Sequence, residues 1–421
     1  MERKIPFFTH ITLVIVGAVF LLIAFRQTLG VRISIWQIML GGAVAMLLSG
    51  SVSPVSALQA IDPDVMIFLF CMFLIGVALE ESGYLSTLST ALLGRAKTAG
   101  GLIVLLVLFA GIGSALLMND TLAVIGTPLV LGYAVRYGIR SQALLLALAF
   151  AVTTGSAASP IGNPQNLLVA TKGGFADPLT AFLIALAPPT VLALLLVCAV
   201  LFVAFREEWG KSLDAPAPPA CIGDPDLTTL ARTSLIVVVA LIIAKIVIFA
   251  VAPGTDIPLI AIAVAAAVPL LVLSPRRTEL VRKVDWATLV FFAALFVVMA
   301  GVRESGALTD LMAGAGEAAP SIPMIIAAGI VLSQFISNVP FVALALPILT
   351  NAGTGDVGML ALAAGSTIAG NLTIAGAASN VIIVQGAERR GATLDFFGFM
   401  KIGLPLTLLQ ATVYTGWLLL I

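Results

Sequence analysis

The sequence carries very little charge for its length. Asp, Glu, Lys and Arg make up 10% of the 421 residues, whereas about 25% is usual in a soluble globular chain. The 21 acidic and 21 basic residues balance each other. There is no basic tract, so the composition gives no reason to expect a nucleic-acid partner. The low share of charged residues excludes an ordinary water-soluble globular protein.

Side chains that hold metals or form covalent intermediates are also scarce. His10 is the only histidine, and the three cysteines, Cys71, Cys198 and Cys221, are scattered along the chain. This spacing gives no disulfide framework and no thiolate metal site. The sequence has no Gly-x-x-x-x-Gly-Lys phosphate loop either. These absences argue against an enzyme, and we expect neither a metal nor a cofactor.

Long apolar runs, in contrast, recur from end to end. Hydrophobic residues make up 60% of the chain, and runs of about 18 to 20 residues are long enough to cross a bilayer as helices. The first run, near residues 11–25, lacks a small-residue cleavage site, so we interpret it as a retained span rather than a signal peptide. The sequence predicts an all-α polytopic protein of the cell's inner (plasma) membrane.

Two polar stretches interrupt the apolar sequence and match each other. The first contains Asn119-Asp120-Thr121, and the second contains Ser337-Asn338. In each stretch the asparagine lies nine positions before a proline. In hydrocarbon, non-helical backbone survives only where it is buried or lines a cavity. We therefore predict two re-entrant hairpins whose tips reach the middle of the membrane.

A second pair of interruptions follows the hairpins. Residues 162–166 read Gly-Asn-Pro-Gln-Asn, and residues 376–380 read Gly-Ala-Ala-Ser-Asn. Their separation along the chain is nearly the same as that of the two hairpin stretches. Glycine and proline break helices, so each segment predicts an unwound transmembrane helix. Two polar interruptions per half, repeated about half a chain apart, indicate an internally duplicated transporter with its site between the halves.

The duplication sets the predicted domain organisation. Residues 1–205 form a first repeat and residues 233–421 a second, joined by a polar cytoplasmic linker at 206–232. We expect about ten transmembrane helices besides the two hairpins and two unwound helices. An odd number of spans per half makes the repeats inverted in topology. Placing the linker in the cytoplasm puts sixteen basic residues in cytoplasmic loops and four outside, which favours extracytoplasmic termini.

Helix N-termini created by the interruptions direct free N–H groups and positive dipole ends into a cavity. Such a site suits a small oxyanion or a neutral polar hydroxide. The predicted substrate-binding residues all lie within the four interruptions or next to them. They are Asn119, Thr121, Gly162, Asn163, Gln165, Asn166, Ser337, Asn338, Thr373, Gly376, Ser379 and Asn380.

Two ionisable side chains lie inside the predicted membrane region. Asp120 is the one carboxylate in a polar break, and an acid buried there is a candidate to carry a coupling proton or ligate a cation. It could equally cap the second helix of the hairpin. Lys245 lies in the middle of a span. It either snorkels or pairs with a carbonyl, or it supplies a fixed positive charge in place of Na⁺.

At these motifs the chain resembles the arsenite permease/sodium–proton antiporter (ArsB/NhaD) family of the ion transporter superfamily, over nearly its whole length. Asn119-Asp120 resembles the Asn-Asp hairpin element of that family, Ser337-Asn338 resembles its second-half partner, and residues 365–376 are similar to a glycine-rich segment of its relatives. The resemblance implies an inverted-repeat transporter with separate scaffold and transport regions. Members export arsenite or antimonite, exchange Na⁺ for H⁺, or carry inorganic or organic anions.

Our leading hypothesis is a secondary active transporter that exports arsenite or antimonite in exchange for protons by alternating access, with Asp120 as the proton carrier. The alternative is a Na⁺/H⁺ antiporter or an anion symporter of the same superfamily. The sodium–dicarboxylate branch carries Ser-Asn-Thr at both hairpin tips, and residues 118–120 and 337–339 depart from that pattern. Two partners stay open: a second copy of the chain in a homodimer, and a cytoplasmic ATPase.

Overall fold

The computed structural model describes the whole chain except residues 1–5, 26–32, 215–222, 253–256 and 307–319. The proline-rich part of the predicted linker and Cys221 lie outside the described residues. The described part is helical apart from turns and one isolated bridge, between Thr98 and Ser212. Seven of its helices are long and apolar enough to cross a membrane, and further apolar helices are shorter. The prediction of an all-helical polytopic protein is confirmed.

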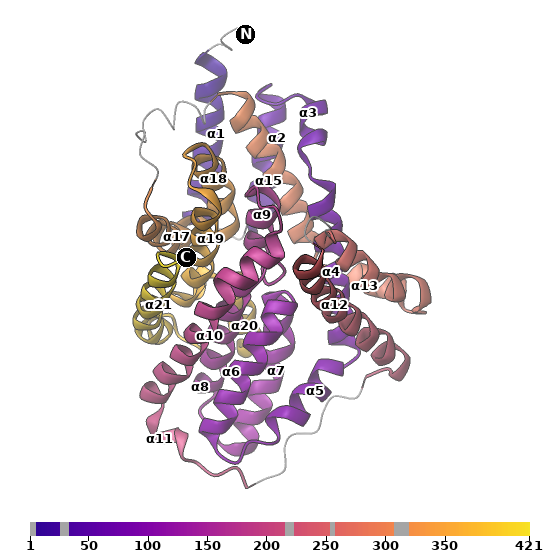
Figure 1. Cartoon of the computed structure of the whole chain (residues 1–421), viewed down its shortest axis with the longest axis vertical. Helices are drawn as coiled ribbons and strands as arrows, with labels where there is room; N and C mark the ends of the chain where they lie inside the picture. Colours follow the sequence, from indigo (N-terminus) through magenta and orange to yellow (C-terminus); the bar gives the residue numbers. More distant parts are fainter. Residues whose placement is uncertain (1–5, 26–32, 215–222, 253–256, 307–319) are drawn as a thin grey trace.

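One set of helices, the scaffold group, contains no interrupted helix. In it α2 packs against α15, and α4 packs against α12 and α13. Figure 1 shows α4, α12 and α13 on the right and α1, α2, α3 and α15 at the top. Its members are α1 (Pro6–Phe25), α2 (Ile35–Leu48), α3 (Pro54–Ala60), α4 (Pro63–Glu81), α12 (Pro225–Val251), α13 (Leu259–Leu273), α14 (Arg277–Lys283) and α15 (Trp286–Glu304).

The other set, the hairpin group, holds both hairpins and both broken helices. Figure 1 shows it on the left and at the bottom, with α9 near the centre. Outside both groups, α5 (Tyr84–Leu93) and α11 (Arg206–Trp209) are short connecting helices. The hairpin group comprises α6 (Ala99–Leu116), α7 (Asn119–Tyr137), α8 (Ser141–Gly155), η1 (Ser156–Ala158), α9 (Pro164–Lys172), α10 (Pro178–Ala204), α17 (Ile322–Ile336), α18 (Asn338–Asn351), α19 (Gly355–Ile368), η2 (Ala369–Asn371), η3 (Ile374–Gly376), α20 (Ala378–Glu388) and α21 (Phe396–Leu418).

Glycines let the helices of the hairpin group approach closely. A Cβ on Gly155 of α8 would lie 2.0 Å from the carbonyl oxygen of Gly111 in α6. In the second half, a Cβ on Gly365 of α19 would lie 2.8 Å from the Cα of Ile326 in α17. Small residues drive helix association in a membrane, because lipid gives apolar side chains no reason to prefer each other. The same device therefore holds both hairpins against the helix that follows.

Helix starts follow local capping signals. Asp224 accepts hydrogen bonds from the backbone N–H groups of Asp226 and Leu227, and Pro225 occupies the first turn of α12. Aspartate at the cap and proline at the first helical position both favour a helix start. For this reason α12 begins inside the segment that composition assigned to the linker. The short helix α5 is a further element that hydropathy alone did not predict.

The order of elements in the first half recurs in the second. A hairpin, α6–α7 or α17–α18, is followed by a broken helix, α8–α9 or α19–α20, and then by a long helix, α10 or α21. Before the hairpins, α4 ends at Glu81 and α15 ends at Glu304, so each half also has a helix that ends at a glutamate. This recurrence supports the duplication, and the repeat boundaries at 205 and 233 stay a prediction.

Candidate functional site

The two hairpins turn at the predicted polar stretches. The first passes from α6 to α7 through Leu117 and Met118 in extended conformation. The second turns at Ser337, the one non-glycine residue with positive φ in the described chain (φ 71°, ψ 155°). A serine held in this region costs about 1–3 kcal/mol, a strain that concentrates at functional sites. Helices α7 and α18 then begin at the tips, with Asn119 and Asn338 as their first residues.

The first broken helix is held by an asparagine. After α8 the chain makes one 3₁₀ turn and runs through residues 159–163 before α9 begins. The Asn166 side-chain Nδ2 donates to the carbonyl oxygens of Ser156 (3.0 Å) and Ser159 (3.2 Å). These carbonyls have left the helical ladder, and buried carbonyls without a partner are costly. Asn166 therefore stabilises the break itself.

The second broken helix repeats this arrangement at the matching positions of the other half. Nδ2 of Asn380 donates to the carbonyl oxygens of Gly370 (2.6 Å) and Thr373 (3.4 Å). Gly370 and Thr373 occupy the positions that correspond to the two acceptors of Asn166. The side chain of Gln334 adds a bond to the Ala369 carbonyl at 2.8 Å. The equal pattern of donors and acceptors supports a common origin for the two halves.

The two breaks also contact each other. The Thr367 hydroxyl donates to the Asn166 Oδ1 at 3.1 Å, and the Asn163 Nδ2 donates to the Thr367 Oγ1 at 3.2 Å. Asn163 also caps α9 by accepting the N–H of Asn166. Because these buried side chains bond across the halves, the broken helices form one polar unit.

A cavity of about 300 Å³, the central cavity, lies where these elements meet. It is lined by residues at the starts of six helices, α2, α7, α9, α15, α18 and α20. Each helix start contributes roughly half a positive charge. Five predicted residues are on its wall. They are Asn119, Asp120, Gln165, Ser337 and Asn338.

The cavity wall is rich in oxygen atoms that lack a partner. The Oδ1 atoms of Asn119, Asp120 and Asn338 are buried and accept no hydrogen bond from the described residues. Buried polar atoms are nearly always paired in folded proteins. Three acceptors beside the positive ends of helices give a ligand both hydrogen-bond acceptors and positive dipoles to bind.

The remaining predicted site residues do not line the central cavity. The side chains of Asn163, Asn166 and Asn380 bond to the broken segments. The Thr373 hydroxyl donates to Gln334 of α17 at 2.7 Å. Ser379 is fully buried, and its hydroxyl has no partner among the described residues. These side chains shape the site, and their role in binding stays a prediction.

Three other predicted positions pack closely against neighbouring elements. A Cβ on Gly76 of α4 would lie 2.5 Å from the hydroxyl of Thr121, so α4 passes directly over the first tip. A Cβ on Gly162 would lie 2.5 Å from the carbonyl oxygen of Ser156. Gly376 is similarly confined, since its Cβ would lie 2.6 Å from the carbonyl oxygen of Ala369. Both glycines are therefore fixed by backbone packing.

Sequence reasoning missed the wall that the scaffold group supplies. Asp285 caps α15 by accepting the N–H and hydroxyl of Thr288 (3.0 and 2.6 Å), and both residues line the cavity with Trp36 and Phe291. Asp285 is the repeat-related counterpart of Asp62, which caps α4 in the first half. The correspondence of Asp62 and Asp285 in the sequence could have indicated a duplicated helix cap. Nothing in the sequence, however, predicted that Asp285 lies opposite the hairpin tips.

Lys245 is the one buried lysine of the described chain, and its side chain is 2% exposed. It donates to the Ile257 carbonyl at 2.9 Å and pairs with Asp177 at 3.1 Å. The expectation that it pairs with a carbonyl is confirmed. Since the pair joins α12 to the start of α10, away from the central cavity, Lys245 does not supply a fixed charge to that cavity.

Charged pairs also occur at helix ends. Glu81 contacts Arg276 (3.2 Å) and Lys283 (2.7 Å) on the scaffold group. The hydrogen bond from Arg276 holds the pKa of Glu279 at about 2. Lys172 of α9 pairs with Asp62 and, although burial opposes it, lowers the pKa of that carboxyl. Among the described residues, no three His, Cys, Asp or Glu side chains gather as a metal site.

Hairpin tips and broken helices that enclose a polar cavity define a class of protein, the helical membrane transporters. The fold agrees with solved transporter structures. It matches the YdaH transporter of Alcanivorax borkumensis with a TM-score of 0.58 and 18% identity, over 97% of both chains. It matches MtrF of Neisseria gonorrhoeae with a TM-score of 0.56 and 14% identity, over 99% of this chain and 95% of that one. At these identities the likeness concerns the fold alone.

Sequence comparison gives the family. Residues 18–359 match the family described as citrate transporter (CitMHS), and this chain belongs to it. An uncharacterized transporter of Mycobacterium bovis is 30% identical over 82% of this chain and 83% of its own length. The silicon efflux transporter of Oryza sativa subsp. japonica is 26% identical over 88% of this chain and 90% of its own. The protein is thus a secondary transporter and not an enzyme, whereas the narrower ArsB/NhaD resemblance stays a prediction.

Proposed function

We propose that this protein exports a small uncharged inorganic hydroxide, arsenite or antimonite, in exchange for protons by alternating access. The observation that carries the proposal is the chemistry of the central cavity. Its described lining contains amide, hydroxyl and carboxylate groups but no Lys or Arg. An anion there would have helix N-termini as its only positive partners, beside Asp120 and Asp285.

A neutral hydroxide fits the pattern of donors and acceptors. At neutral pH arsenite is largely the uncharged trihydroxide, which donates three O–H groups. The unpartnered Oδ1 atoms of Asn119 and Asn338 would accept them, while N–H groups at the helix starts would donate to its oxygens. A neutral solute also avoids the desolvation cost of burying a charge.

Asp120 is proposed as the proton carrier. It lies in the first turn of α7 beside Asn119, and its Oδ1 is buried without a partner among the described residues. A carboxylate is expensive to move through a membrane while charged. After the substrate has been released outside, the empty site must turn back to face the cytoplasm. Protonation of Asp120 would neutralise its carboxylate and so permit this return.

The test is arsenite flux in proteoliposomes with an imposed pH gradient. Wild-type protein is compared with Asn119→Ala, and Val272→Ala serves as the control because Val272 is exposed on α13, which does not line the central cavity. The proposal expects flux that follows the gradient, collapses in Asn119→Ala and persists in Val272→Ala. Absence of arsenite flux in an active preparation would overturn it. Silicic acid belongs in the same assay, because a rice relative is named for silicon efflux.

A second candidate is symport of an organic anion, favoured by the description of the family as citrate transporters. Six helix starts attract negative charge, but the two carboxylates of the cavity repel it. Citrate would therefore enter with cations that offset its charge. Citrate flux that requires Mg²⁺, with no arsenite flux, would favour this candidate. Sodium-dependent stabilisation, absent in potassium buffer, would instead favour Na⁺/H⁺ exchange.

The organisation proposed for the chain follows from the duplication. We keep inverted repeats at 1–205 and 233–421, a cytoplasmic linker at 206–232, and extracytoplasmic termini in the plasma membrane. Labelling of cysteines introduced at residue 2 and residue 214 of intact cells would test this, since only the first would react from outside. A homodimer and a cytoplasmic ATPase remain proposals that cross-linking in membranes can examine.

A further inference from the structure

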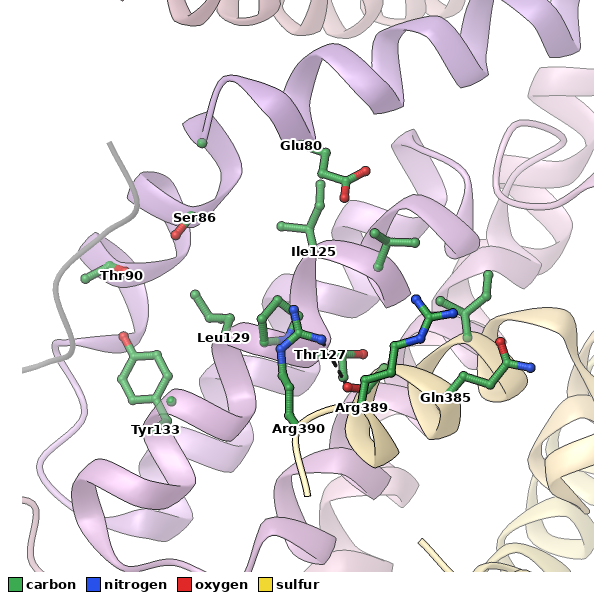
Figure 2. A pocket seen from close by; sticks show the side chains of 16 residues that line it. Glu80, Ser86, Thr90, Ile125, Thr127, Leu129, Tyr133, Gln385, Arg389 and Arg390 are labelled. Atoms are coloured by element: carbon green, nitrogen blue, oxygen red, sulfur yellow. Dashed lines mark hydrogen bonds between the residues drawn. The ribbon is translucent and has the colours of Figure 1, made fainter. Parts of the chain in front are cut away.

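Two more cavities are related to each other by the repeat. The first, the α20 cavity, has a volume of about 570 Å³ and is lined by α4, α5, α7 and α20 (Figure 2). The second, the α9 cavity, has about 550 Å³ and is lined mainly by α15, α18 and α9. Helices α4 and α15, α7 and α18, and α20 and α9 are the repeat-related pairs. Exchanging the halves therefore turns one cavity into the other.

Individual lining positions match as well. Pro128 of the α20 cavity corresponds to Pro347 of the α9 cavity, in the alignment that pairs the two hairpin tips. Ile382 corresponds to Leu168, in the alignment that pairs the two broken helices. The two cavities are thus equivalent openings between the scaffold group and the hairpin group, as two access routes to one central site require.

Their charges, however, are not equivalent. Glu80 at the end of α4 lines the α20 cavity, and its repeat-related counterpart, Arg303 of α15, lines the α9 cavity. The hairpin group brings a positive charge to both: Arg389 and Arg390 follow α20, and Lys172 ends α9. Closing the α20 cavity brings opposite charges together, whereas closing the α9 cavity brings like charges together.

The pairing seen in the structure agrees with this difference. Lys172 already pairs with Asp62. Glu80, Arg389 and Arg390 form no ion pair within the described chain, where Arg390 donates to the Gly386 carbonyl at 3.0 Å. Figure 2 shows Glu80 on one side of the α20 cavity, with Arg389 and Arg390 on the opposite side. Of the two arginine side chains, only that of Arg389 has neither an ion pair nor a hydrogen bond within the described chain, and it faces a carboxylate, Glu80, that forms no ion pair there.

We propose that Glu80 and Arg389 form an ion pair when the α20 cavity closes, and that this pair is the gate on that side of the transporter. At the opposite gate, Arg303 and Lys172 are both positive and cannot form such a pair. That gate therefore depends on the Lys172–Asp62 pair instead. The proposal rests on alternating access and not on the identity of the substrate. A failed arsenite assay therefore leaves it standing, and its own failure leaves the proposed substrate untouched.

The first test measures access to the α20 cavity. Ile382→Cys, in a chain whose three native cysteines are replaced by alanine, is labelled in membrane vesicles with an impermeant thiol reagent. A partly exposed ion pair shifts a conformational equilibrium by about two- to fivefold. We expect Glu80→Gln and Arg389→Gln each to raise the labelling rate by that factor, and Glu80→Arg with Arg389→Glu to restore it. Arg303→Gln is the control and should not raise it.

The second test does not need the charges to be exchanged. Cysteines at positions 80 and 389 should form a disulfide under mild oxidation, because the gate brings these positions together. The matched control pairs position 80 with position 388, since Glu388 is exposed and does not line the cavity. Unchanged labelling in both single variants, or equal cross-linking of the two cysteine pairs, would overturn the proposal. Selective cross-linking at 389 with faster labelling in the variants supports it.

Discussion

The scaffold group and the hairpin group satisfy their polar atoms in different ways. In the scaffold group, charges pair at helix ends, as Glu81 does with Arg276 and Lys283. In the hairpin group, neutral amides such as Asn166 and Asn380 donate to main-chain carbonyls freed by broken helices. Neutral amides avoid the cost of burying charge. The difference teaches that broken helices within a membrane protein can be held by backbone groups and neutral amides, while ion pairs form mostly at helix ends.

The largest expected effect is on proton coupling, and it tests whether only the hairpin group carries the coupling proton. Asp120→Asn keeps the size of the side chain but cannot lose a proton, so pH-driven flux in proteoliposomes should disappear. Asp285→Asn, on the scaffold wall, should keep coupling, because asparagine caps a helix as well as aspartate. Unchanged pH-driven flux in Asp120→Asn, or its loss in Asp285→Asn alone, would reverse the assignment.

The next effect concerns stability. Asn166→Ala removes the donor to two buried carbonyls and should lower the free energy of unfolding by about 3 kcal/mol, since each unsatisfied group costs about 1–3 kcal/mol. Asn380→Ala should cost a similar amount, because its Nδ2 donates to the matching pair of carbonyls. Thermal unfolding in detergent measures both, with Val272→Ala of the scaffold group as the control, because that side chain is exposed on α13. A small loss in both variants would mean that the breaks are held by other contacts.

A smaller effect separates tight from loose helix packing. Gly155→Ala places a methyl group against the Gly111 carbonyl and should destabilise by about 2 kcal/mol, as overpacking does. Gly17→Ala in α1 meets no atom within 4 Å and should stabilise by about 0.5–1 kcal/mol through helix propensity. Melting temperatures of the two variants should move in opposite directions. A shift of the same sign would contradict this contrast between the two positions.

The smallest effect lies at the rim of the scaffold group. The pKa of Glu279 is lowered from 4.5 to about 2, first by its hydrogen bond with Arg276. Because its pKa is lower in the folded state, the carboxylate stabilises the fold above pH 4.5, and this contribution is lost as the pH falls toward 2. The Glu279→Gln variant should show a flatter melting temperature between these pH values. Identical pH profiles would show that the pair contributes nothing measurable.

Much of this architecture was readable from the chain. The apolar runs predicted the spans, because each backbone polar group in lipid must be bonded within its own helix. The interruptions at Asn119 and Asn338 predicted the hairpin tips, and those at Gly162 and Gly376 predicted the breaks, because such residues in a span need a cavity or a buried partner. The repeated spacing of these interruptions predicted the duplication.

Only the tertiary structure separated wall residues from supporting ones. Asn119 and Asn166 are both asparagines in polar breaks, yet the first faces the cavity and the second bonds to carbonyls. The sequence specifies which residues are polar, but the direction of a side chain depends on which helices pass beside it. Asp285 lies on the cavity wall because α15 packs against α2 and begins opposite the hairpin tips. Local sequence determines where helices break, and long-range packing determines what the breaks enclose.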